Sequence, residues 1–272
     1  MIELIQEMFS YRFMLRAITA GGLISLCAAL LGVSLVLKRY SMIGDGLSHV
    51  GFGALALATV MNAAPLAVAI PVVVAAAFFL LRISGNSKIK GDAAIGLISA
   101  GSLAIGVMMI SMTSGVNTDV YNYMFGSILA MSDGDVWLCV GLAAVVLFLF
   151  VWCYTRMFAV TFDETFARAT GTRVGLYNGL LAALTAVTIV LGMRLMGSLL
   201  ISSLIIFPAL TAMRVCKRFI SVILSAGVIS VVCFFAGMMM SYAWGTPAGA
   251  SVVVVNLAVF LVFYVIGALR ER

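Results

Sequence analysis

Two ionisable side chains lie close together in the stretch SMIGDGLSHV at residues 41–50: Asp45 and His49, the only histidine of the chain. In a helix, a separation of four residues turns the two side chains by only about 40° around the axis, so both point to one side. A carboxylate oxygen and an imidazole nitrogen placed in this way can bind one divalent cation, and the combination suits zinc, manganese or iron(II). Two ligands are too few to hold a metal tightly, so other residues or a second subunit must complete the site.

The same pair also allows other interpretations. In a purely structural one, Asp45 caps the helix and His49 hydrogen-bonds a neighbouring carbonyl. In a third, the two side chains relay protons in a proton-coupled secondary transporter, for which matched broken helices in inverted repeats would be expected. Ionisable groups within apolar spans are costly and usually functional, which favours a cation site over the structural interpretation.

Small residues flank the pair in two stripes on nearly opposite sides of the expected helix. One stripe consists of Gly44, Ser48 and Gly51, and the other consists of Gly46 and Gly53. Small side chains let neighbouring helices approach closely, so we expect both stripes to be helix-packing surfaces. The ionisable pair lies between the stripes, and we therefore expect it to face protein rather than lipid.

The chain around this site is strongly apolar. Of its 272 residues, 64% are hydrophobic and only 10% are charged, and its mean hydropathy is +1.22. Such a composition is typical of a membrane protein, in which backbone polar groups must be paired internally by helices or by a closed barrel. Apolar runs of about 20 residues favour helices. We therefore predict an all-α, polytopic membrane protein whose residues 1–272 form a single transmembrane domain.

Nine apolar segments indicate eight to nine transmembrane helices. They cover residues 13–37, 43–61, 64–82, 93–112, 136–155, 175–193, 196–213, 219–241 and 248–268. If every segment crosses, five clusters of Lys and Arg fall on one side, which is then cytoplasmic, with the N-terminus outside and the C-terminus inside. Arg12 and Arg16 argue against an external N-terminus, so eight spans with both ends inside is the alternative. The net charge of +6 is distributed between the spans and does not indicate nucleic-acid binding.

Two cytoplasmic stretches are expected to be structured. In TFDETFARATG, Thr161 or Asp163 can cap a short surface helix that ends near Gly171. In FPALTAMRVCKRF, Pro208 should break or kink the preceding span near its inner end. About ten residues from Pro208 to Phe219 would then lie at the cytoplasmic surface.

Several stretches together resemble the permease subunits of bacterial ABC importers for zinc, manganese or iron(II), the ABC-3 or zinc/manganese permease family. They follow in the family's order: LKRYSMIGDGLSHVGFGALALA, KGDAAIGLISAGSLAIGVMMIS, YNYMFGSILAMSDGD, FDETFARATGTRVG, MGSLLISSLIIFPALTA and GTPAGASVVVV. The resemblance implies a type II ABC importer-like permease in the bacterial inner (plasma) membrane. It further implies pairing with a second copy of the chain, with a cytoplasmic ABC ATPase dimer and with an extracytoplasmic metal-binding protein.

The resemblance also assigns roles to individual residues. Asp45 and His49 match the positions that contact the metal on its way through, and the wording GDGLSHV is nearer to zinc permeases than to manganese permeases. Zn(II), or else Mn(II) or Fe(II), would be transported cargo, with no permanently bound cofactor. The segments 161–174 and 208–220 match those that meet the ATPase. The residues that we expect to dock the ATPase are Pro208, Ala209, Met213, Arg214, Val215, Lys217 and Arg218, with Asp163 and Glu164 as a secondary contact.

The sequence contains no motif for enzymatic activity of its own. It has no GxxxxGK[ST] phosphate-binding loop, no HExxH and no Ser–His–acid arrangement. This disfavours an intramembrane enzyme. If transport uses ATP, a separate partner chain must hydrolyse it.

Overall fold

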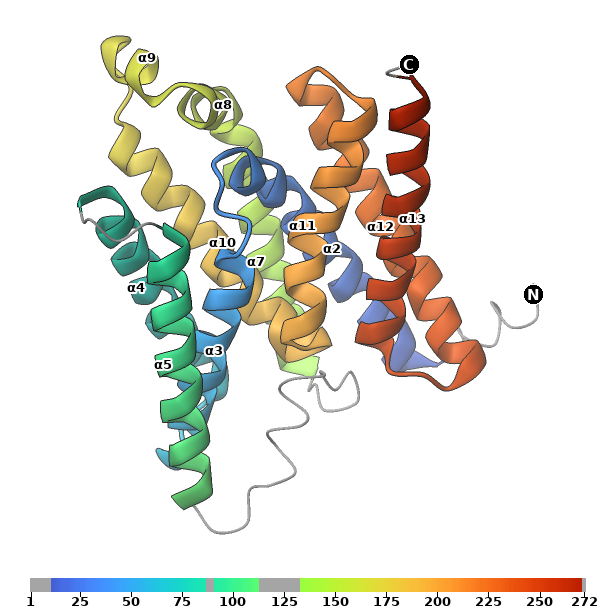
Figure 1. Ribbon diagram of the computed structural model, residues 1–272. Helices are drawn as coiled ribbons and strands as arrows, with labels where there is room; N and C mark the ends of the chain where they lie inside the picture. The colour runs from blue at the N-terminus through green and yellow to red at the C-terminus, as the bar shows by residue number, and fades with distance from the viewer. Residues whose placement is uncertain (1–10, 87–90, 113–132, 271–272) are drawn as a thin grey trace.

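The computed structural model describes residues 11–86, 91–112 and 133–270, and all regular secondary structure in these ranges is helical (Figure 1). The long helices are α2 (Arg12–Leu37), α3 (Ile43–Val60), α4 (Pro65–Asn86), α5 (Gly91–Met112), α7 (Asp133–Trp152), α10 (Val174–Met196), α11 (Ser198–Val215), α12 (Phe219–Trp244) and α13 (Ala248–Arg270). Two shorter helices, α8 (Tyr154–Phe162) and α9 (Glu164–Ala169), join α7 to α10.

Eight of the described helices are long and apolar enough to cross a membrane, and α7 together with α8 adds a ninth candidate that is bent by 69°. The expectation of an all-α protein with eight to nine spans is thus confirmed. Successive long helices run alternately up and down in Figure 1, so α2 begins at the end opposite to that at which α13 finishes. The α2–α3 turn, helices α8 and α9, and the α11–α12 turn lie at the upper end, which we call the basic end because Lys38, Arg156 and Lys217 lie there.

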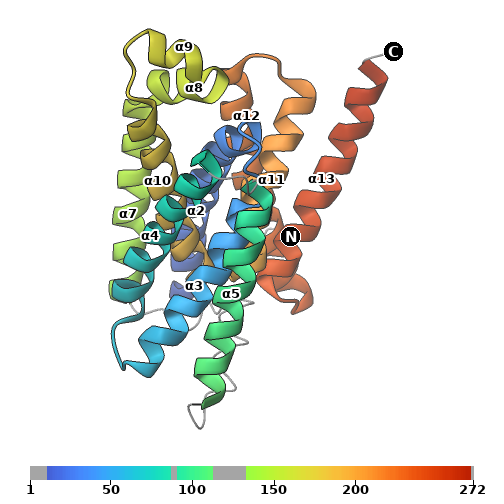
Figure 2. The same cartoon turned by 60° about the vertical axis from the view of Figure 1, so that its left-hand side comes forward.

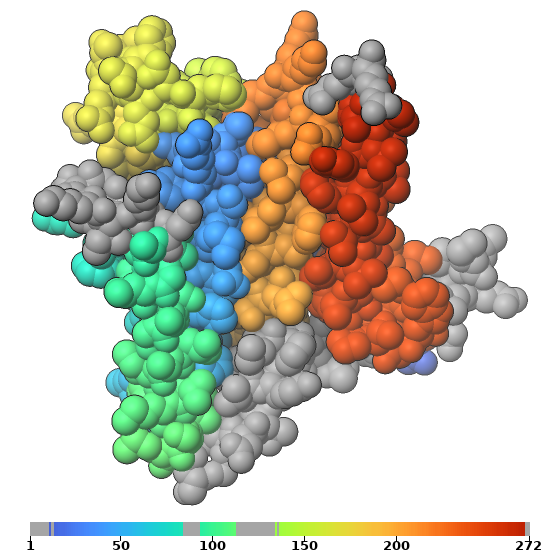
Figure 3. Space-filling view, in the orientation of Figure 1, coloured from blue at the N-terminus to red at the C-terminus, as the bar shows by residue number. Residues whose placement is uncertain are grey.

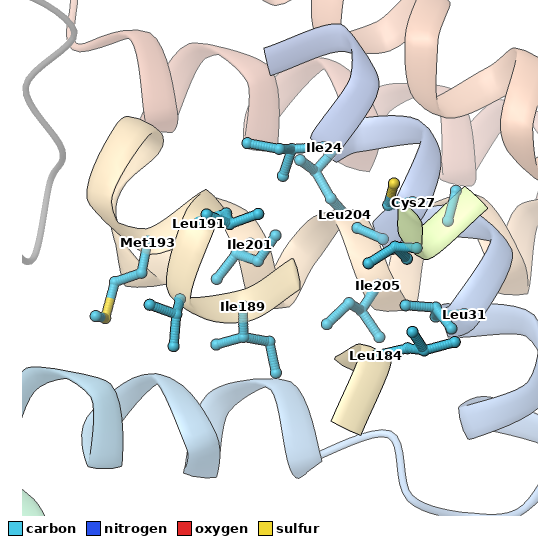
Figure 4. Packing of buried hydrophobic residues seen from close by; sticks show 14 of the residues in the cluster. Ile24, Cys27, Leu31, Leu184, Ile189, Leu191, Met193, Ile201, Leu204 and Ile205 are labelled. Atoms are coloured by element: carbon cyan, nitrogen blue, oxygen red, sulfur yellow. The ribbon is translucent and has the colours of Figure 1, made fainter. Parts of the chain in front are cut away.

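Helices α2, α10 and α11 form the centre of the bundle. Their apolar side chains meet in one buried cluster, in which Ile24 and Leu31 of α2 lie near Ile201, Leu204 and Ile205 of α11 (Figure 4). Helices α3 and α5 lie side by side (Figure 2), and α13 lies on the opposite flank of the bundle (Figure 1). The central helices therefore fix the positions of α3 and of the turns at the basic end.

Glycine allows the central helices to approach within backbone contact. A Cβ atom added to Gly32 of α2 would overlap the carbonyl oxygen of Ile205 in α11. A Cβ atom added to Gly22, which lies nearer the start of α2, would have no neighbour within 4 Å. The space beside Gly32 is filled by backbone atoms of Ile205 in α11, which cannot move aside as a flexible side chain can.

The expectation that Pro208 ends its span is wrong. Helix α11 runs through Pro208 and continues to Val215, so the α11–α12 connection contains only residues 216–218. Pro208 and Ala209 are both buried against the rest of the chain. Proline removes one backbone hydrogen bond, but packing by neighbouring helices can hold a membrane helix together at such a point.

The short surface helix expected at 161–171 is present as α9. The carboxylate of Asp163 accepts a hydrogen bond of 2.9 Å from the backbone N–H of Phe166, so Asp163 is the N-cap. Thr161, the alternative cap, lies inside α8, where its hydroxyl donates to the carbonyl of Met157. Gly171 follows the helix with φ +78°, a conformation that glycine adopts without strain.

The close approach of α2 and α11 predicts that Gly32→Ala destabilises the bundle by about 1–3 kcal/mol, as overpacked core sites do. Gly22→Ala is the matched control, and we expect it to be neutral or slightly stabilising because alanine favours helix by about 1 kcal/mol over glycine. Thermal unfolding of both variants in detergent measures the difference. Equal unfolding temperatures for the two variants would contradict the backbone contact.

Candidate functional site

Asp45 and His49 lie in the first two turns of α3, on one side of the helix. The Nε2 atom of His49 is 3.7 Å from the Oδ2 atom of Asp45. Two ligand atoms that each lie about 2.1 Å from a tetrahedral zinc ion are about 3.4 Å apart, so the observed separation is close to what a shared cation requires. Among the described residues there is no group of three or more His, Cys, Asp or Glu side chains that could hold a metal. The pair alone therefore provides an incomplete coordination shell.

The structural interpretation of the pair is not supported by its contacts. The N-cap of α3 is Met42, and no side chain caps this end of the helix. Within the described part of the chain, the interaction of His49 with Asp45 is the single polar contact that either side chain makes. Asp45 lies in the first turn, where the positive end of the helix dipole favours a carboxylate.

The two stripes of small residues on α3 contact different neighbours. A Cβ atom added to Gly44 would lie 3.5 Å from Cα of Ser202 in α11, and one added to Gly53 would lie 2.8 Å from the carbonyl oxygen of Ser102 in α5. Ser48 is fully buried, and its hydroxyl donates to the carbonyl of Gly44 at 2.7 Å.

The remaining two glycines extend these contacts along the helix. A Cβ atom added to Gly51 would lie 2.7 Å from the side chain of Met193 in α10, and one added to Gly46 would overlap the side chain of Ile95 in α5. One stripe therefore packs on α10 and α11, and the other packs on α5.

The pair lies on the side of α3 that the described helices cover only in part. Leu47 and Val50, on the opposite side of the helix, are buried in the core. The pair lies between the contacts with α5 and those with α11, and we call this side the α3 face. Figure 3 views the molecule from this direction, with the surface of α3 exposed between α5 and α11. The side chain of His49 remains 22% exposed and that of Asp45 47% exposed.

The residues expected to dock an ATPase differ widely in exposure. Arg214, Lys217 and Arg218 are exposed, and the Arg214 guanidinium lies 4.6 Å from the centre of the Tyr264 ring. Met213 and Val215 are half-buried. Pro208 and Ala209 are buried within the chain, so an outside partner can reach only the part of this set from Met213 onward.

Helix α8 and the start of α12 bring the two expected ATPase-facing segments together. The rings of Phe158 and Phe162 pack against Phe219, with ring centres 5.0 and 5.5 Å apart respectively. Phe166 of α9 is 63% exposed. Sequence reasoning missed these aromatic residues, although Phe158 and Phe162 are four residues apart and therefore lie on one face of α8.

Glu164, the secondary docking candidate, is held from inside the molecule. Its Oε1 atom lies 2.6 Å from Nζ of Lys38, at the end of α2, and accepts a hydrogen bond of 3.0 Å from Nδ2 of Asn178 in α10. Partial burial acts to raise the pKa of Glu164, but the hydrogen bonds from Lys38 and Asn178, together with the positive charges of Lys38 and Arg168, outweigh it and lower that pKa below its usual range. In the sequence alone, Lys38 is one member of the basic clusters that mark the cytoplasmic side.

Comparison with known proteins identifies the family of the chain. The ABC 3 transport family matches residues 10–267 of the chain. The manganese import system permease protein ScaB of Streptococcus gordonii is 30% identical over 264 residues, which cover 97% of this chain and 95% of that protein. The high-affinity zinc uptake system membrane protein ZnuB of Haemophilus influenzae is 28% identical, with 92% of this chain and 96% of that protein covered.

Solved structures give the same result for the fold. PsaBC from Streptococcus pneumoniae, solved in complex with Fab, contains a chain that superposes with a TM-score of 0.87 and is 30% identical, with 97% of this chain and 95% of that chain covered. A second structure, an inward-facing conformation of a putative metal-chelate type ABC transporter, superposes with a TM-score of 0.72 at 15% identity. The match covers 92% of this chain and 85% of that chain, and it supports the fold alone. The chain is a multi-pass protein of the bacterial plasma membrane, and it belongs to the ABC 3 transport family of permeases.

Proposed function

We propose that this chain, as one transmembrane domain over residues 1–272, is the permease subunit of an ATP-driven importer of divalent transition metal ions, and that the metal passes Asp45 and His49. The observation that carries this proposal is the 3.7 Å contact between a carboxylate and an imidazole on a helix face that the described helices cover only in part. Relatives named for manganese import and for zinc uptake support the class of cargo. The metal is cargo, and no permanently bound cofactor is required.

A second copy of the chain is the proposed source of the missing ligands. The pair supplies two donors, and the α3 face between α5 and α11 remains open in one copy. A two-fold axis beside this face would bring two Asp45–His49 pairs together and enclose the metal. Closed two-fold symmetry is the commonest arrangement of protein assemblies.

Zinc is the proposed preferred metal, and manganese is the main competitor. The support for zinc is the wording GDGLSHV around the pair and the higher affinity of nitrogen- and oxygen-containing sites for zinc than for manganese. Relatedness favours neither metal, because named manganese and zinc permeases are 30% and 28% identical to the chain.

The energy for transport is proposed to come from a separate ATPase that docks at the basic end, while an extracytoplasmic binding protein delivers the metal. Met213 and Val215 would provide an apolar contact, and the exposed Arg214, Lys217 and Arg218 would surround it with positive charge. Apolar anchors supply most of the affinity at such interfaces, and the surrounding charges set orientation and association rate. Asp163 and Glu164 on the neighbouring α8–α9 segment form the secondary contact.

Asp45→Ala and His49→Ala should each abolish uptake while leaving folding and assembly intact. We expect a loss of about 100-fold or more, because even second-shell partners of metal ligands contribute 10- to 100-fold to metal affinity. Uptake of zinc and of manganese is measured in vesicles that contain the permease, the ATPase and the binding protein. Thr59→Val, on the same helix but away from the pair, is the control.

Three results of that experiment would contradict parts of the proposal. Normal uptake by either alanine variant removes that residue from the metal route. Faster uptake of manganese than of zinc by the wild type overturns the zinc preference. Uptake that depends on a proton gradient and continues without the ATPase would favour a proton-coupled transporter instead.

In an Asp45→Cys variant, a short bifunctional thiol reagent should cross-link position 45 to the same position in a second copy of the chain. The prediction follows because equivalent residues beside a two-fold axis face each other. Denaturing gels of treated membranes measure the dimer, with the parent chain and its five cysteines as background. Val228→Cys, on the exposed side of α12, is the control. Equal dimer yields at positions 45 and 228, or one copy per purified complex, would contradict a two-fold axis at the α3 face.

Met213→Asp combined with Val215→Asp should release the ATPase and abolish metal-stimulated ATP hydrolysis, because two charges would replace the apolar contact. Co-purification of the ATPase with the permease measures the loss. Met61→Asp makes the same kind of change at the opposite end of the bundle and should leave the ATPase bound.

Because Met213 and Val215 are half-buried, a second variant tests the same surface without touching the core. Lys217→Glu combined with Arg218→Glu reverses two exposed charges, and we expect weaker, more salt-sensitive association with the ATPase. If both double variants bind the ATPase at the normal ratio, the dock lies elsewhere.

A further inference from the structure

The turn between α2 and α3, residues 38–42, connects a contact with α9 to the Asp45–His49 pair. In the proposed function, α9 belongs to the ATPase-facing surface and the pair belongs to the metal route. At its start, Lys38 is the C-cap residue of α2 and contacts α9. Immediately after its end, the first turn of α3 carries Asp45. Lys38, which contacts the proposed ATPase-facing segment, and Asp45, the first residue of the proposed metal route, are therefore only seven positions apart in the chain.

The contact of Lys38 with α9 is short, half-buried and shared by three helices. Its ammonium nitrogen lies 2.6 Å from Oε1 of Glu164 and 2.7 Å from Oδ1 of Asn178. The Lys38 side chain is only 7% exposed. A lysine in such surroundings depends on its carboxylate partner, because an unpaired buried charge is strongly unfavourable. Movement of α9 must therefore either carry Lys38 along or leave its charge unpaired.

The turn itself is too tightly bonded to absorb such a movement. The backbone N–H of Tyr40 donates to the carbonyl of Leu35 at 2.9 Å, and that of Ile43 donates to the carbonyl of Tyr40 at 3.0 Å. Arg39 adopts φ +62°, which fixes the reversal of the chain between the two helices. A displacement of Lys38 is thus passed to the start of α3 through hydrogen-bonded backbone.

We infer that Lys38 is a positioning residue that transmits movement of α9 to the Asp45–His49 pair, so that events at the ATPase change the geometry of the metal route. The inference rests on the proposed function, because it requires an ATPase that acts on α9. It differs from a purely structural role, in which the Lys38–Glu164 contact would hold the bundle together without affecting how ATP hydrolysis is linked to transport.

The test uses the complete complex of permease, ATPase and binding protein in vesicles, with the number of metal ions moved per ATP hydrolysed as its readout. Lys38→Met keeps the length of the side chain and removes its charge. We expect metal moved per ATP to fall about tenfold while ATP hydrolysis continues, as a coupling between sites of typical strength would give. Lys38→Arg retains a cation that can reach Glu164 and should restore most of the ratio.

Arg39→Gln is the matched control, because Arg39 is a neighbouring, exposed cation whose side chain makes no hydrogen bond or ion pair within the described part of the chain. It should leave the ratio unchanged. A wild-type ratio for Lys38→Met would overturn the inference, and so would proportional losses of hydrolysis and uptake that leave the ratio intact.

A further variant, Asn178→Leu, tests the inference if Lys38→Met does not assemble. Asn178→Leu removes one partner of Lys38 and leaves the Glu164 contact, so we expect an intermediate ratio, and an unchanged ratio overturns the inference. Failure of the proposed function itself is recognised separately. In that case the wild-type complex moves no metal with ATP, or Asp45→Ala moves it normally.

Discussion

The hydrocarbon interior of a membrane offers no hydrogen-bonding partner, and this constraint governs most of the molecule. Every described backbone segment at that depth is helical, and hydroxyl side chains within the helices donate back to carbonyls of their own helix. Thr185 and Thr188 of α10 do so at 2.7 and 2.8 Å, and Thr211 of α11 does so at 2.7 Å. The same constraint explains why α11 continues through Pro208, because a helix end at that depth would leave several carbonyls without partners.

Against this background, Asp45 and His49 are exceptional. They are ionisable, they contact each other, and they lie on a side of α3 that the described helices cover only in part. An arrangement of this kind is unfavourable for an isolated subunit in lipid. It would become favourable if a second copy of the chain covered the face and a cation balanced the carboxylate, which is the assembly that we propose.

The basic end links this site to the surface on which ATP-driven movement would act. Phe158 and Phe162 join α8 to the start of α12, while Lys38 joins α9 to the end of α2. The central helices hold these elements against one another through glycine contacts such as that of Gly32 with Ile205. Because close-packed helices resist gradual deformation, a displacement at one end is expected to move helices as units.

The sequence by itself determined the features that depend on neighbours along the chain. Runs of apolar residues predicted the helices, and the four-residue spacing placed Asp45 and His49 on one side. A cap at Thr161 or Asp163 and a stop at Gly171 predicted the short helix α9, and the structure chose Asp163 as the cap. Each of these follows from local periodicity or from capping, which act within one or two helical turns.

Only the tertiary structure decided which helices flank the pair, that Pro208 is buried inside a continuous helix, and that Lys38 reaches Glu164. Lys38 and Glu164 are 126 residues apart in the chain, and neither residue type nor spacing indicates such a contact. The burial of Pro208 likewise depends on helices that surround α11 rather than on its immediate neighbours. These features arise from packing between distant segments, for which a single sequence carries no periodic signal.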